Sequence, residues 1–146
     1  MVDITECHVI TPEVDAARPT IKELLATFLP AGKTVHVTVN QTHAGLDIAV
    51  EGKIAPEDSR KRAAADAVRR LGFARLTVNG EIILAPKRPL VAFGDVTVSP
   101  PPGAFLQAVP AMEEQMADIV TAHMAKSKRV ADLYAGCGTF ALRLAK

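Results

Sequence analysis

With 146 residues, of which 49% are hydrophobic and 23% charged, the chain has the composition of a globular protein and is long enough for one domain, or for a small domain and part of another. Its formal net charge of +1 excludes a strong attraction of the whole chain to polyanions, so any nucleic-acid surface must be local. Two cysteines are too few for a disulfide scaffold, and neither a membrane-spanning run nor a secretory signal is recognisable, so we expect a cytoplasmic protein with no membrane partner.

The first part of the chain alternates between helical and extended patterns. Residues 2–10 are predicted to be extended, and apolar residues at helical spacing predict a helix over residues 14–29, which a proline and a glycine close. Alternation of apolar and polar residues predicts strands over residues 34–40 and 46–50. The short polar loop between these strands favours a hairpin.

A second helix and a second hairpin follow. Residues 55–71 have a proline and two acids near the start, an alanine-rich apolar stripe, and Gly72 at the end, which is the pattern of a capped helix. Asn79 and Gly80, between two β-rich stretches, are a strong hairpin signal, and residues 90–98 supply one more extended stretch. This order predicts an α+β domain, an antiparallel sheet with packed helices.

The composition changes at residues 99–103, Ser-Pro-Pro-Pro-Gly, which cannot pair inside a sheet. We therefore place a domain boundary there, with a central α+β domain over residues 1–99 and a second domain over residues 100–146. The second part is predicted to contain a helix, a buried strand over residues 128–134, a glycine loop and a further helix. A strand, an acid, a Gly-x-Gly turn and an apolar helix are typical of the first βα unit of a nucleotide-binding domain, although an ordinary tight turn has the same pattern.

Two motifs together carry a family resemblance. Residues 103–110 read Gly-Ala-Phe-Leu-Gln-Ala-Val-Pro, and residues 132–140 read Asp-Leu-Tyr-Ala-Gly-Cys-Gly-Thr-Phe. They resemble the S-adenosylmethionine-dependent RNA (uracil-5)-methyltransferases, in which (Gly/Asp)-Phe-x-Gln-x-Asn precedes a helix and Asp-Leu-(Tyr/Phe)-Cys-Gly-x-Gly-x-Phe. Tyr134 stands where most class I methyltransferases have their first glycine. The resemblance is looser upstream, where residues 2–7 and 42–47 look like the family's central domain.

The resemblance implies a cofactor, a reaction and a set of binding residues. Residues 100–146 would be the first helix, strand and helix of a truncated Rossmann-like domain that binds S-adenosylmethionine. By position, Gln107, Tyr134 and Thr139 match residues that contact the cofactor in the family, and Asp132, Gly136 and Gly138 would shape the loop. From the residues alone, Gln107 also fits a surface amide and Tyr134 a core ring.

The resemblance further implies methyl transfer to C5 of uridine in tRNA or rRNA, hence an RNA partner. In the family the nucleophilic cysteine and a glutamate base lie far downstream of this loop, so the chain alone is expected to be inactive and to contain no catalytic residue. Ala135 departs from the family's usual cysteine, and Cys137 occupies a variable position. A truncated domain is also expected to expose apolar surface, which predicts self-association, docking onto the central sheet, or disorder.

Two interpretations stay open for Cys7. Asp-Ile-x-x-Cys in some family members carries the last of four ligands of a [4Fe–4S] cluster, so Cys7 would be a ligand in a longer protein that supplies the other three. In this chain, by itself, Cys7 is expected to be a partly buried or free thiol.

Basic residues on the helix at 55–71 raise the question of RNA contact. Arg62, Arg69 and Arg70 are candidates for phosphate binding, but Asp66 lies at pairing distance from two of them, which favours an ordinary solvated face. The alternative to an enzyme fragment is a non-catalytic RNA-binding or assembly module. A third alternative is a methyltransferase-like domain that acts on another substrate.

Overall fold

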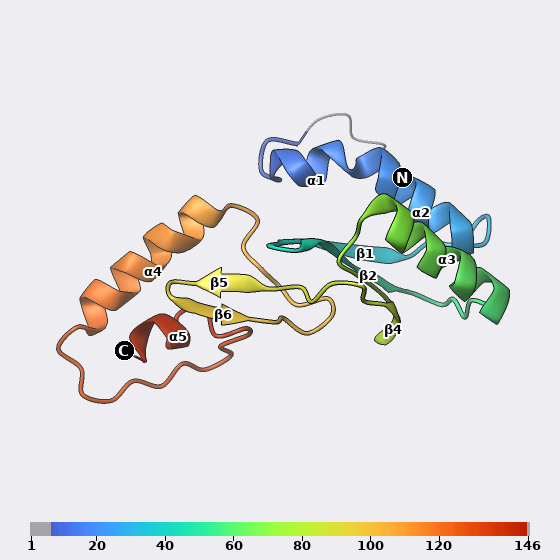
Figure 1. Ribbon diagram of the computed structural model, residues 1–146. Coiled ribbons are helices and arrows are strands. Elements are labelled where there is room, and N and C mark those ends of the chain that lie inside the picture. The colour runs from blue at the N-terminus through green and yellow to red at the C-terminus, as the bar shows by residue number, and fades with distance from the viewer. Residues whose placement is uncertain (1–6, 146) are drawn as a thin grey trace.

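The computed structural model describes residues 7–145 and contains a four-stranded sheet with helices on one face (Figure 1). Its elements in chain order are α1 Pro12–Ala16, α2 Arg18–Phe28, β1 His36–Thr42, β2 Gly45–Glu51, α3 Asp58–Leu71, β3 Arg75–Val78, β4 Glu81–Leu84, β5 Val91–Phe93, β6 Val96–Val98, α4 Pro110–Met124 and α5 Ala141–Leu144. None of the described helices is long and apolar enough to cross a membrane. The α+β class predicted from the sequence is confirmed.

The sheet is mixed, with strand order β1-β2-β3-β4, and not antiparallel throughout as predicted. Both predicted hairpins form, β1 with β2 and β3 with β4, but β2 and β3 pair in parallel, with Ile48 opposite Leu76. The physical reason is the connection, because α3 carries the chain back across the sheet and β3 therefore starts at the same end as β2.

The predicted helix over residues 14–29 is two helices. α1 ends at Ala16, and α2 begins at Arg18 with Pro19 in its first turn. Proline has no N–H for the i→i−4 ladder, so a continuous helix cannot run through this position without losing a bond. Of the stretch predicted to be extended, residues 7–10 form no strand, and residues 2–6 lie outside the described part of the chain.

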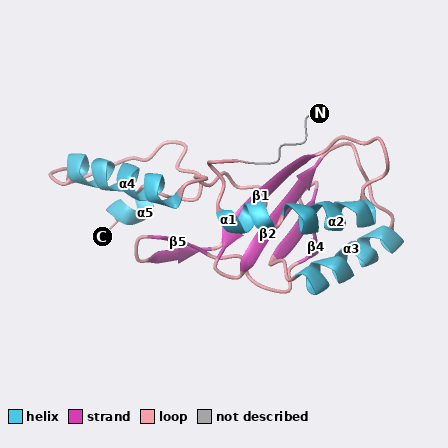
Figure 2. Cartoon of the chain, turned by 90° about the horizontal axis from the view of Figure 1, so that it is seen from above, coloured by secondary structure: helices cyan, strands magenta, loops and turns pink. Residues whose placement is uncertain are grey.

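One face of the sheet carries the hydrophobic core. The helices α2 and α3 lie side by side over it (Figures 1 and 2). Leu24 and Phe28 from α2 and Val68 from α3 are almost completely buried against Ile48 and Leu76 of the sheet. The buried residues recur at helical spacing in the helices and at alternate positions in the strands, which explains why the sequence patterns predicted helices and strands here.

The other face of the sheet is polar and is covered by the chain after β4. The guanidinium of Arg75 donates to both carboxylate oxygens of Asp47, at 2.8 and 2.6 Å, and also to the carbonyl of Pro100 at 2.9 Å. Both side chains are buried, and so is Pro100. The Nδ2 of Asn40 donates to the carbonyl of Ala104 at 2.8 Å. The proline-rich stretch predicted to separate two domains is thus bound across the sheet.

The remaining elements extend to one side of the sheet. The β5–β6 hairpin forms a separate two-stranded sheet, and α4 and α5 lie beyond it (Figures 1 and 2). Arg143 of α5 connects these pieces, because it donates to Glu113 of α4 at 3.1 Å and its guanidinium lies 6.0 Å from the centre of the Phe93 ring. The C-terminal part therefore has its own small contact network.

The prediction of a buried strand over residues 128–134 is wrong for the described structure. These residues are irregular, and Leu133 is 81% exposed. A buried strand needs a partner, and in the described chain β5 and β6 pair with each other while the four-stranded sheet lies elsewhere. The predicted Rossmann-like beginning is not formed, and the helix after the loop is limited to α5.

Candidate functional site

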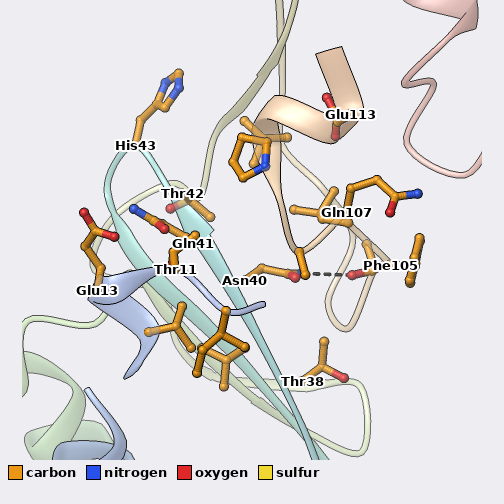
Figure 3. Close-up of a pocket in the computed structure, with 18 of the residues that line it drawn as sticks. Thr11, Glu13, Thr38, Asn40, Gln41, Thr42, His43, Phe105, Gln107 and Glu113 are labelled. Atoms are coloured by element: carbon orange, nitrogen blue, oxygen red, sulfur yellow. Dashed lines mark hydrogen bonds between the residues drawn. The ribbon is translucent and has the colours of Figure 1, made fainter. Parts of the chain in front are cut away.

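A pocket of about 730 Å³ lies along the outer edge of β1 (Figure 3). It is lined by residues 10–14, 38–43, 91–93 and 104–108 and by Pro110 and Glu113. β1 is the edge strand of the four-stranded sheet, and α1 and the segment before α4 flank it. The pocket thus brings together residues from both predicted domains.

Three hydrogen bonds to main-chain groups hold the walls of this pocket in place. Asn40 holds Ala104, Arg75 holds Pro100, and the N–H of His43 donates to the carbonyl of Leu90 at 2.9 Å. Because the loop over residues 99–108 has no regular structure of its own, these contacts with the sheet determine its path. They place Phe105 and Gln107 at the pocket.

The pocket has an acidic rather than a basic lining. Its two carboxylates are Glu13 and Glu113, and none of its lining residues is Lys or Arg. Arg143 pairs with Glu113, whereas Glu13 is exposed. The hydroxyl of Thr11 is buried with no hydrogen-bond partner among the described residues. This lining disfavours a phosphate and suits a neutral or positively charged polar group.

The glycine loop after residue 131 forms a tight turn, and its glycines are required by the backbone. Gly136 and Gly138 have φ of 57° and 87°, which favours glycine. A Cβ on Gly138 would lie 2.9 Å from Cγ of Leu142, whereas a Cβ on Gly136 would meet nothing within 4 Å. Asp132 accepts a hydrogen bond from the N–H of Ala141 at 3.1 Å and so joins the two ends of the loop.

The predicted cofactor-binding residues do not all lie at one place. Gln107 lines the pocket along β1, but Asp132, Tyr134, Gly136, Gly138 and Thr139 are not among its lining residues. Tyr134 is fully exposed and has φ of 61°, which is uncommon for a residue other than glycine. Its exposure excludes a core ring in the described structure. The space beside Gly136 is open, because a Cβ there would meet nothing within 4 Å, and Gln107 and the loop do not line one common pocket.

Cys137 does not have the environment of a catalytic thiolate, and Cys7 does not lie in a group of metal ligands among the described residues. Burial raises the pKa of the Cys137 thiol above its ordinary value of 9.0, which disfavours the thiolate that a nucleophile needs. Cys7 is a half-buried free thiol, and within residues 7–145 no three metal-ligating side chains come together. The residues present therefore do not fit a [4Fe–4S] cluster.

Two of the three arginines considered for RNA binding are paired. Arg69 lies 3.2 Å from Asp66, and Arg70 lies 2.6 Å from Glu23 on α2. Arg62 is exposed and makes no ion pair within the described part of the chain. Both pairs are at the surface, and they leave Arg62 as the unpaired one of the three arginines among the described residues.

The chain is similar in sequence to several known proteins. No known protein-family profile matches the chain. It is 46% identical over 147 aligned residues to an uncharacterized RNA methyltransferase of Rhizobium meliloti and 45% identical to one of Mesorhizobium japonicum, and the alignments cover 100% and 99% of the chain. The predicted resemblance to RNA methyltransferases is confirmed. A protein of Zymomonas mobilis with the same description is 27% identical over the whole chain.

The alignment covers only part of each RNA methyltransferase. The chain spans about 35% of the length of the Rhizobium and Mesorhizobium proteins. The similarity to RNA methyltransferases thus concerns one segment of longer proteins, and the segment includes both the mixed sheet and the glycine loop.

Sequence reasoning missed the β1 side of the pocket. Thr38, Asn40 and Gln41 belong to an alternating strand and carry no motif. The one available signal was Asn40, because asparagine is depleted in strands and a buried one needs a specific hydrogen-bond partner. That partner, Ala104, is 64 residues away, so only the tertiary structure reveals it.

Proposed function

We propose that this chain is a segment of an S-adenosylmethionine-dependent RNA methyltransferase that transfers a methyl group to C5 of uridine in tRNA or rRNA. The observation that carries the proposal is the similarity, at 40–46% identity across the chain, to proteins described as RNA methyltransferases. Their description names neither the base nor the RNA. The uridine assignment is supported by residues 103–110 and 132–140, whose pattern includes Tyr134 in place of a glycine.

The chain's own groups have distinct roles in this proposal. The open turn at Gly136 lets the cofactor approach the backbone, and Tyr134 and Thr139 would lie against it. Gln107 would supply a directional amide from the loop held by Asn40. S-adenosylmethionine supplies the methyl group when bound.

The covalent part of the chemistry is not supported by Cys137, the cysteine of the glycine loop. Addition of a thiolate to C6 of uracil requires a cysteine in its ionised form with a base nearby. Burial raises the pKa of Cys137, which works against that ionised form. We therefore propose that the nucleophile and the base belong to another part of a protein of the relatives' length, and that this chain alone is inactive.

The proposal is tested with a protein of the relatives' length that contains this segment. It is incubated with unmodified tRNA or rRNA transcripts and S-adenosylmethionine carrying an isotopically labelled methyl group, and the RNA nucleosides are separated by mass. Labelled 5-methyluridine is expected, and the 146-residue chain should form none. A different labelled nucleoside would overturn the uridine assignment, and no label in either RNA would overturn the reaction.

A pair of glutamine variants tests the site. In the longer protein Gln107→Ala should lower kcat/KM by about tenfold or more, because an oriented amide is lost. Gln115→Ala on the exposed face of α4 is the matched control and should leave it unchanged. Equal activities of the two variants would remove Gln107 from the cofactor site.

A further inference from the structure

We propose that a basic patch on the outer side of α3 and the loop after β4 binds the phosphate backbone of RNA. The patch consists of Arg62, Arg69, Lys87 and Arg88. The inference rests on the proposed function for the identity of the partner, and it adds the surface by which this segment holds that partner. The patch shares no residue with the pocket along β1, and β1 and β4 are opposite edges of the sheet.

The helix α3 brings two of the four cations onto one side. Arg62 and Arg69 are seven residues apart, which is close to two full turns, so they lie on the same side of the helix about 10 Å apart along its axis. Both are exposed. Arg70 is directed elsewhere, because it pairs with Glu23 on α2 at 2.6 Å. The outer side of α3 therefore carries an elongated basic surface.

The loop after β4 brings Lys87 to the end of this helix, and β4 lies beside α3 (Figure 1). The backbone N–H of Lys87 donates to the carbonyl of Ala74 at 3.3 Å, and its Nζ donates to the carbonyl of Gly72 at 3.4 Å. Gly72 is the residue that ends α3, three positions after Arg69. Two segments that are distant in sequence thus place cations next to each other.

The backbone on both sides of Arg88 is fixed. Before it, Lys87 is bonded to Ala74, and after it Pro89 is buried and the carbonyl of Leu90 accepts the N–H of His43 at 2.9 Å. The side chain of Arg88 is exposed and has no ion pair with any other described residue. A phosphate bound here therefore orders one side chain and not a loop, which lowers the entropic cost of binding.

The patch is more positive than the rest of the chain. Its four cations and Asp66, which pairs with Arg69, together carry a charge of +3, whereas the whole chain carries +1. Stabilisation of the C-terminal end of α3 accounts for Arg69 and Lys87, but not for Arg62 and Arg88. An exposed, elongated surface of one sign fits a chain of phosphates better than a single anion.

The salt dependence of RNA binding tests the proposal. A fluorescently labelled tRNA transcript is titrated with the 146-residue chain at several NaCl concentrations, and the anisotropy gives Kd at each. Arg62→Gln/Arg88→Gln removes two exposed cations that pair with no described residue, so the fold should be unchanged. Two lost phosphate contacts should lower the slope of log K against log[salt] by roughly 1.5 to 2 and weaken binding about tenfold at low salt.

A double variant at the opposite end of the sheet is the matched control. Lys53→Gln/Arg60→Gln makes the same change in net charge at two exposed residues near the start of α3. It should leave the slope unchanged. Equal losses in the two double variants would show a response to net charge alone and would overturn the patch. An unaltered chain that binds no RNA at low salt would overturn it as well.

The acid within the patch gives a prediction of opposite sign. Asp66→Asn removes the negative charge beside Arg69, so RNA binding should become about two- to fivefold tighter, the size of a surface ion pair. Weaker binding would contradict the patch. Polyglutamate of similar length should not displace the RNA at equal ionic strength. If it does, the surface binds acidic protein segments and the RNA assignment fails.

Activity of a protein of the relatives' length separates this inference from the proposed function. There Arg62→Gln/Arg88→Gln should raise KM for RNA and leave kcat unchanged, because the contacts are the same in the ground state and the transition state. If the longer protein methylates no RNA but binding depends on the patch, the proposed function fails and the patch stands. Methylation with an unchanged KM would overturn only the patch.

Discussion

The buried pair of Asp47 and Arg75 is the feature with the greatest consequence at the scale of single residues. Their side chains are 1% and 8% exposed, and the pair also holds the carbonyl of Pro100. Removing two charges from water is costly, so such a pair is maintained only when the partners satisfy each other. The pair fixes the loop over the polar face of the sheet rather than adding much net stability.

Breaking this pair should strongly destabilise the protein. Asp47→Asn leaves the Arg75 charge buried without its counter-charge, and the free energy of unfolding should fall by about 3 kcal/mol or more. Urea denaturation followed by circular dichroism measures it. Asp66→Asn is the matched control, because its pair with Arg69 is at the surface and the change should be below about 0.5 kcal/mol. Equal losses in the two variants would contradict this role for the buried pair.

The thiol of Cys137 should titrate above pH 9.0. Burial raises its pKa, so in a Cys7→Ser variant the rate of alkylation by iodoacetamide should rise with a midpoint above that value. The folded state favours the neutral thiol, so this contribution to stability is fully present below pH 9.0 and is lost as pH rises through the folded pKa. A midpoint below 9.0 would mean that Cys137 is an activated thiolate.

At the scale of elements, α2 is held by one buried stripe. Leu24 is completely buried and Leu25 only partly, although the two residues are neighbours with the same side chain. Leu24→Ala should therefore lower the free energy of unfolding by about 2–5 kcal/mol, and Leu25→Ala should cost clearly less. Thermal and urea unfolding of both variants measure the difference. A larger loss for Leu25→Ala would place the core on the other side of the helix.

Local patterns predicted the elements of the first half, and the reason is local chemistry. Asn79 and Gly80 both have positive φ, as the tight turn between β3 and β4 requires, and Gly72 ends α3 in the left-handed conformation. The parallel pairing of β2 with β3 was not predictable in this way. Both hairpins are compatible with either arrangement, and only the path of α3 over the sheet decides it.

The stretch over residues 128–134 has the pattern of a buried strand and yet forms none. Its apolar residues favour a strand in the middle of a sheet, but no described strand lies beside it. A strand is stabilised by its neighbours, so the same residues have a different structure when those neighbours are absent. The sequence pattern thus shows that residues 128–134 can form a buried strand, but the strand forms only where neighbouring strands complete the sheet.

This gives a prediction at the scale of the whole molecule. In the 146-residue chain the amides of residues 129–134 should exchange with solvent fast, while those of β2 and β3 should be strongly protected. In a protein of the relatives' length the same amides should become protected, because partner strands would be present. Hydrogen exchange with mass spectrometry measures both. Strong protection in the short chain would show that residues 129–134 have found a partner, by self-association or docking.

In the candidate site, too, local motifs predicted some features and long-range contacts decided others. Gln107 and the loop from Asp132 to Thr139 were recognisable from their motifs, because turns, glycines and helix starts are encoded locally. Their placement was not, since the loop that carries Gln107 depends on Asn40, which is 64 residues from its partner Ala104. Tyr134 is fully exposed and does not line the pocket. A motif identifies the candidate residues, but long-range contacts decide which of them lie close together in the structure.

By itself, the sequence determined the α+β class, both hairpins, the capped helix α3 and the resemblance to RNA methyltransferases, since periodicity, turn chemistry and local motifs are properties of short segments. Only the tertiary structure decided the mixed order of the sheet, the polar face closed by Asp47 and Arg75, and the acidic pocket along β1. Those features depend on contacts between distant residues, whose geometry follows from how the helices and loops pack.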